Sequence, residues 1–238
     1  MGFQLSKGGK MKNLIKILLI CFTTSAIAGN NDIYLTQSGG GDFTLQIDQI
    51  GSTNVVGTSG ARVIMAGSSL DANIKQQGAT NTLVASILQA NTSSWTMWQV
   101  GDSNTSTITA GGSGSVASSD FDYSATGNTN VLTWLQGSSS PATGGNFDAA
   151  ITGNTNDLNI RSEVIGAINN WDIDGNSNDI DVTQIGTDDK AITFTLVGDS
   201  NNIDIDQTTA ASGVTDTISL VANSTSGTIN IDQCTSGC

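Results

Sequence analysis

The chain has 238 residues, of which 21 are acidic and only eight are basic, and it contains no histidine. The negative charge argues against nucleic acid as a partner, because phosphate binding depends on clustered Lys and Arg. The lack of histidine removes Ser-His-Asp and Cys-His catalytic arrangements and the usual zinc centres, so we expect no enzyme.

The first segment in chain order predicts a secretory signal peptide over residues 1–28. Lys10 and Lys12 precede the apolar run 14–22, and Ala26-Ile27-Ala28 supplies small residues for cleavage. Met11 is an alternative start. The apolar run is shorter than the roughly 20 residues that a membrane-spanning helix needs, so the protein is not expected to be membrane-embedded. We expect a secreted protein, located outside the cell or at its surface.

The mature domain should occupy residues 29–238 and fold as one unit. It keeps four basic residues against the 21 acidic ones, which gives a net charge of −17. A charge of one sign keeps exported copies apart unless a directional contact overcomes it.

A repeat runs through this domain. The pattern Gly-x-Ser/Thr-Asn occurs seven times, with successive glycines 22 to 27 residues apart. Gly and Asn tolerate left-handed backbone angles, so each copy is interpreted as a tight corner. The predicted corner glycines are Gly51, Gly78, Gly101, Gly127, Gly153, Gly175 and Gly198.

Between the corners, apolar and polar residues alternate. Segments 31–37, 130–136, 178–184 and 201–207 place Asn, two apolar residues and Gln at every second position, and a second set of alternating segments precedes the corners. Because strand side chains point to opposite faces with a period of two, one face is a core and the other is wet. The pattern predicts an all-β fold, a β-solenoid of stacked strand-turn-strand rungs with about 23 residues per rung.

Inward Asn and Gln side chains can be satisfied in such a stack. Identical amides in rungs about 4.8 Å apart lie above one another and form hydrogen-bonded ladders along the axis. The predicted members of this amide-ladder core are Asn31, Gln37, Gln49, Asn54, Gln76, Asn81, Gln99, Asn104, Asn130, Gln136, Asn156, Asn178, Gln184, Asn201, Gln207 and Gln233.

Two cysteines close the chain. In an oxidising compartment Cys234 and Cys238 could form a disulfide that clasps the last rung. No metal site and no cofactor are expected, since two thiolates alone do not complete a zinc shell. Weak surface binding of calcium between columns of Asp remains an alternative, because repeated oxygen ligands suit a hard cation.

The repeats resemble those of curlin, the major subunit of curli. The resemblance is carried by Gln49-x-Gly51-x-x-Asn54, Gln76-x-Gly78-x-x-Asn81 and Gln99-x-Gly101-x-x-Asn104 and covers most of the mature chain. It implies a functional amyloid that polymerises into fibres for adhesion or biofilm matrix. The partners that it implies are further copies of the chain, a nucleator subunit and an outer-membrane exporter.

Two other functions fit the composition. A monomeric solenoid could act as a surface adhesin or recognition module for glycan, ice or another solid, as Thr105-x-Thr107-x-Thr109 and Thr193-x-Thr195 suggest. A β-helical carbohydrate-active enzyme would need paired carboxylates. The carboxylates clustered around one corner are Asp172, Asp174, Asp179 and Asp181.

Overall fold

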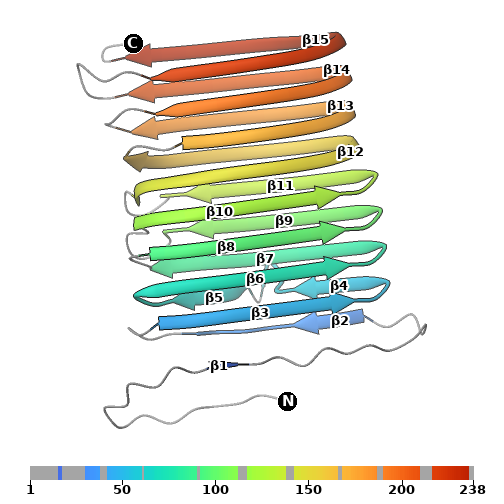
Figure 1. Ribbon diagram of the computed structural model, residues 1–238, viewed down its shortest axis with the longest axis vertical. Coiled ribbons are helices and arrows are strands. Elements are labelled where there is room, and N and C mark those ends of the chain that lie inside the picture. The colour runs from blue at the N-terminus through green and yellow to red at the C-terminus, as the bar shows by residue number, and fades with distance from the viewer. Residues whose placement is uncertain are drawn as a thin grey trace.

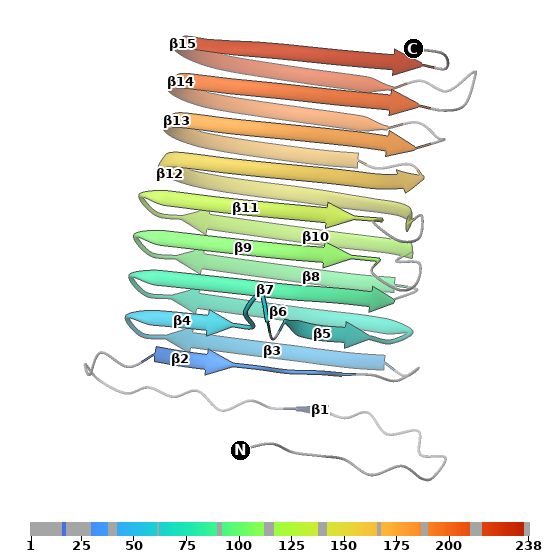
Figure 2. The ribbon, with the colours of Figure 1, turned by 180° about the vertical axis from the view of Figure 1, so that it is seen from behind.

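The protein is an all-β parallel β-solenoid, as the sequence predicts (Figure 1). The computed structural model describes residues 16–17, 30–37, 42–60, 62–89, 92–111, 117–137, 142–165, 168–186, 190–209 and 216–235. Two sheets face each other across the core, and β1 (Lys16–Ile17) and β15 (Thr217–Thr235) lie at opposite ends of the stack (Figures 1 and 2).

The first sheet contains the strands that lead into each corner. In stacking order they are β1 (Lys16–Ile17), β3 (Asp42–Ile50), β6 (Ser69–Gln77), β8 (Thr92–Val100) and β10 (Ala117–Thr126), followed by the N-terminal halves of four long strands that lie between residues 142 and 235.

The second sheet contains the strands that follow each corner. They are β2 (Asn30–Ile33), β4 (Thr53–Val56), β5 (Val63–Ala66), β7 (Thr80–Gln89), β9 (Ser103–Ala110) and β11 (Thr129–Gln136), and then the C-terminal halves of the long strands. Those long strands pass through the corner unbroken. They are β12 (Ala142–Ile165), β13 (Ile168–Gly186), β14 (Ala191–Thr209) and β15 (Thr217–Thr235).

The alternating sequence produces the core directly. In β3 every second side chain is buried, so that Phe43, Leu45 and Ile47 point inward. Further along the stack, aromatic rings from both sheets pack in a continuous pile, with neighbouring ring centres 4.4 to 6.0 Å apart. Its members are Trp95, Phe121, Trp134, Phe147, Trp171 and Phe194.

The rung length varies around the predicted 23 residues. From Asn31 to Asn201 the steps along one column are 23, 27, 23, 26, 26, 22 and 23 residues. The longest step contains the break between β4 and β5, where Gly57 has a positive φ of 71°. The asparagine column keeps its register in spite of these differences, and the pairing of β5 with β7 shifts register locally between Met65 and Ala66.

Most of the predicted signal peptide lies outside the described residues. Its described part, Lys16–Ile17, pairs in parallel with Thr44 and Leu45 of β3. Within the ranges described above, no helix is long and apolar enough to cross a membrane.

Candidate functional site

A column of asparagines runs through the corner side of the core. Each Nδ2 except that of the last member donates to Oδ1 of the asparagine one rung nearer the C-terminus, at 2.7 to 2.9 Å. Apart from the first, these side chains are at most 2% exposed. The column consists of Asn31, Asn54, Asn81, Asn104, Asn130, Asn156, Asn178 and Asn201.

Backbone carbonyls fix the direction of this ladder. The nitrogen of Asn54 also donates to the carbonyl of Gln77 at 2.9 Å, and that of Asn81 donates to Val100 at 3.0 Å. A carbonyl oxygen only accepts, so the atom facing it must be the amide nitrogen. The asparagines from Asn31 to Asn178 therefore donate toward the C-terminal end of the stack.

The glutamines form a second type of ladder with the opposite direction. On the first sheet Gln76 donates to Gln49 at 2.9 Å and Gln99 donates to Gln76 at 2.8 Å, toward the N-terminal end. The group ends at Gln99, whose Oε1 accepts from the Tyr123 hydroxyl at 2.9 Å. Burial raises the pKa of Tyr123 to about 12, against a smaller lowering by Ser106, so the phenol keeps the proton that it donates.

On the second sheet the glutamine column is interrupted. Gln207 donates to Gln184 at 2.9 Å and Gln233 donates to Gln207 at 2.7 Å. Ser162 occupies the position between Gln136 and Gln184 and reaches only Gln136, through its hydroxyl at 3.4 Å. The shorter side chain leaves the Nε2 atoms of Gln136 and Gln184 buried and without a hydrogen-bond partner among the residues that the structure describes.

Gln37 does not stack on another glutamine. Its Oε1 accepts from the backbone nitrogen of Ala66 at 3.0 Å. It follows the bridge between Thr36 and Ile64, so its neighbour in the column is Met65.

The corner glycines are required for a different reason from the one predicted. The described glycines with positive φ are Gly57, Gly111 and Gly137, and no predicted corner glycine is among them. Successive corners approach so closely that a Cβ on Gly101 would collide with the carbonyl oxygen of Gly78. The pattern repeats along the stack, so the side chain is excluded by the rung beneath and not by the backbone angle.

The last described rung leaves the ladders incomplete. Gly227 lies opposite Asn201 and ends the asparagine column, whereas Gln233 continues the glutamine column. Ile229 and Ile231 occupy inward positions, yet they are 47% and 43% exposed. Among the described residues β15 pairs only with β14, so this edge is open.

A buried ion pair near this end was not predicted from the sequence. Lys190 and Asp216 lie 3.3 Å apart with side chains that are at most 1% exposed, and Thr209 bonds to both. The backbone nitrogen of Lys190 also donates to Asp216, at 3.1 Å. The only hint in the sequence is a lone lysine in an acidic region, since its partner is 26 residues away.

The predicted clasp is described at one end only. Cys234 is disulfide-bonded, and Cys238 lies outside the described residues.

The outward face of the second sheet gathers carboxylates. Partial burial, and then repulsion from Asp179, Asp204 and Asp157, raise the pKa of Asp181 above its usual value. Within the described part of the chain, no three acidic or cysteine side chains are grouped so that they could hold a metal ion.

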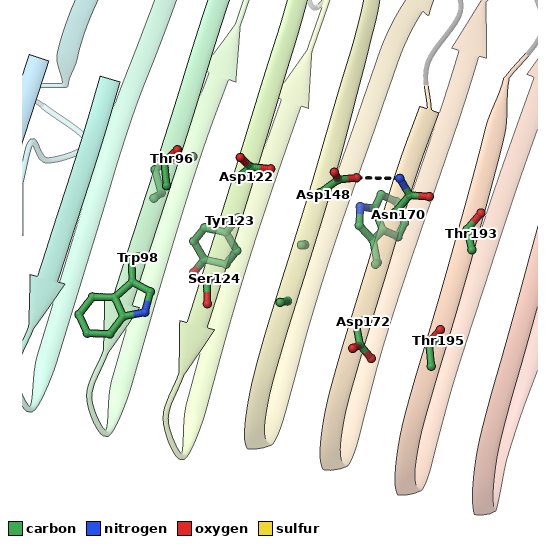
Figure 3. A pocket seen from close by; sticks show the side chains of 14 residues that line it. Thr96, Trp98, Asp122, Tyr123, Ser124, Asp148, Asn170, Asp172, Thr193 and Thr195 are labelled. Carbon is green, nitrogen blue, oxygen red and sulfur yellow. Dashed lines mark hydrogen bonds between the residues drawn. The ribbon is translucent and has the colours of Figure 1, made fainter. Parts of the chain in front are cut away.

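The first sheet carries a shallow outward trough (Figure 3). Its lining includes the small side chains of Ser124 and Ala150 and the carboxylates of Asp122 and Asp148. Asp148 accepts from Asn170 at 2.8 Å. Trp98 flanks the trough, with the Lys75 ammonium 4.6 Å from its ring centre.

Comparisons with protein-family models, with curated proteins and with solved structures gave no match for this chain. The class that the structure defines is a parallel β-solenoid with stacked Asn and Gln ladders.

The glycine contacts predict that Gly101→Ala destabilises the protein. Its Cβ would force apart two stacked corners, and overpacking of this kind costs about 1–3 kcal/mol. Urea unfolding followed by circular dichroism measures the change. Gly60→Ala is the matched control, because nothing lies within 4 Å of a Cβ there. Equal stability of the two variants would show that the corners do not need glycine.

Proposed function

We propose that the chain is a secreted structural protein that assembles into curlin-like amyloid fibres, which serve in adhesion or as biofilm matrix. The observation that carries the proposal is the open edge of β15, where apolar side chains and an unfinished glutamine ladder face solvent. A second copy that continues the sheets would bury these groups and pair the backbone of the edge strand.

The proposed partners follow from this mode of assembly. The main partner is another copy of the chain, and a nucleator subunit and an outer-membrane exporter are proposed from the resemblance to curlin. Secretion is proposed from the leader over residues 1–28. We propose a non-enzymatic role, because the ladders give the chain a structural use for most of its buried polar side chains.

The trough favours a second candidate, a monomeric adhesin or recognition module. An aromatic ring beside hydroxyl, amide and carboxylate groups suits a neutral polar ligand such as a glycan. This function would need no contact between the ends of two copies.

The fibre proposal predicts that the purified chain forms unbranched, thioflavin-positive filaments. Incubation at neutral pH, followed by electron microscopy and fluorescence, tests it. Filaments should be seeded by preformed fragments, because an exposed rung is the template for the next copy. A chain that stays monomeric at high concentration over days, even with seeds, would contradict the proposal and favour the adhesin.

The acidic face predicts that Asp181→Asn stabilises the protein at pH 7. The raised pKa means that the folded state binds this proton more tightly than the unfolded state does. The native fold is therefore disfavoured at neutral pH, and stability is regained as the pH falls toward the raised pKa. The substitution should raise the melting temperature at pH 7 by about 1–3 °C and have less effect at pH 4.

The control for this variant is Asp42→Asn, which removes the same charge at an exposed position on the first sheet. If both variants shift the melting temperature equally at pH 7, the effect comes from net charge and not from the carboxylates around Asp181.

A further inference from the structure

The two ends of the stack differ in what their ladders offer. At the C-terminal end Gln233 donates to Gln207 and to the carbonyl of Asp216 at 3.1 Å, and its Oε1 accepts no hydrogen bond from the described residues. At the N-terminal end Gln37 accepts from Ala66 through its Oε1, and its Nε2 makes no hydrogen bond within the described residues. One end presents an acceptor and the other presents a donor.

Gln37 and Gln233 belong to the same column. The strand pairings connect Met65, the neighbour of Gln37, through Ile87, Ala110 and Gln136 to Ser162. They then continue through Gln184 and Gln207 to Gln233. A further copy placed above β15 in unbroken register would bring its Gln37 directly over Gln233.

We infer that assembly is head-to-tail on the second sheet, with the residues 31–37 of an incoming copy docked on residues 227–233 of β15, and with Gln37 Nε2 donating to Gln233 Oε1. This inference rests on the proposed fibre function. The glutamine ladder keeps its direction across such a joint, because Gln207 and Gln233 both donate toward the N-terminal end of the stack.

The remaining side chains in this register are compatible. Ile33 and Leu35, which are partly buried, would cover the exposed Ile229 and Ile231. On the outward face Asp32 would meet Thr228, and Asp232 would meet Thr36. No two carboxylates would lie directly opposite each other, so the net negative charge is not concentrated at the joint.

Joining two identical ends is disfavoured by the same ladders. Two C-terminal ends would bring acceptor against acceptor at Gln233, and two N-terminal ends would bring donor against donor at Gln37. Two facing acceptors or two facing donors cannot form a hydrogen bond. Burying them in the joint would therefore cost their hydration free energy without the return of a hydrogen bond.

The joint lacks the hydrogen bond between asparagine side chains that links successive rungs from Asn31 to Asn201. Gly227 stands where the internal rungs have asparagine, so the Oδ1 of the incoming Asn31 finds no side-chain donor. The backbone of Asn201 leaves no room for a Cβ at Gly227. The contact between copies therefore depends on the glutamine pair and the isoleucines.

A charge exchange at the glutamine pair tests the joint. Gln37→Glu replaces the donor by a carboxylate, and Gln233→Lys replaces the acceptor by a donor that can still reach Gln207. Each single variant should slow seeded elongation about tenfold or more, because a charge is buried against an unsuitable partner. The double variant should elongate within about threefold of the original chain, because the introduced carboxylate of one copy then meets the introduced ammonium group of the next.

The matched control places the same charges on outward positions in the middle of the stack, as Thr105→Glu and Thr133→Lys. Neither of these single changes should slow elongation by more than about twofold, because their charges stay in solvent. Circular dichroism of the monomers checks that each variant folds. Single variants that elongate normally, or a double variant slower than both, would overturn the joint. The second result would indicate contacts between identical ends. If the original chain forms no filaments, the fibre proposal itself fails.

Discussion

The structure depends on stacking chemically equivalent side chains in register. Neighbouring parallel strands are about 4.8 Å apart. A side-chain amide carries a donor and an acceptor on opposite sides of one carbon atom, so equivalent amides at this spacing can donate to one another while they keep the same rotamer. A buried asparagine without partners would cost several kcal/mol, so each rung is stable only when another rung lies on it. The asparagine column holds from Asn31 to Asn201 although the rung length changes by up to five residues, because variation is absorbed between the columns.

The repeat made the fold and much of the site predictable. Seven copies of one corner pattern and strict alternation identify the inward face, and the asparagine at each corner is easy to align. The glutamines were harder. Two groups of glutamines stack on one another, namely Gln49, Gln76 and Gln99 on the first sheet and Gln184, Gln207 and Gln233 on the second. Gln37 and Gln136 have no glutamine on the next rung, because Met65 and Ser162 lie there. Which residue lies on the next rung depends on the register between strands that are distant in sequence. The close approach of Gly101 to Gly78 and the pairing of Lys190 with Asp216 also follow from contacts between rungs, so sequence patterns within one rung could not reveal them.

The opposed directions of the two ladder types give the stack a polarity that the repeat pattern alone does not contain. Asparagines donate toward the C-terminal end and glutamines toward the N-terminal end, and backbone carbonyls hold both arrangements in place. This polarity, together with the exposed isoleucines of β15, makes the two ends complementary to each other. Net negative charge opposes association in general, so contacts of this directional kind are what a self-assembling acidic chain requires.

The buried asparagine ladder is tested most directly by hydrogen exchange of its side-chain amides, followed by nuclear magnetic resonance on selectively labelled protein. Burial in the ladder predicts that the side-chain amide protons of Asn104, Asn130 and Asn156 are protected as strongly as the backbone amides of the same strands, while those of the exposed Asn202 exchange rapidly. Rapid exchange at all four positions would contradict it.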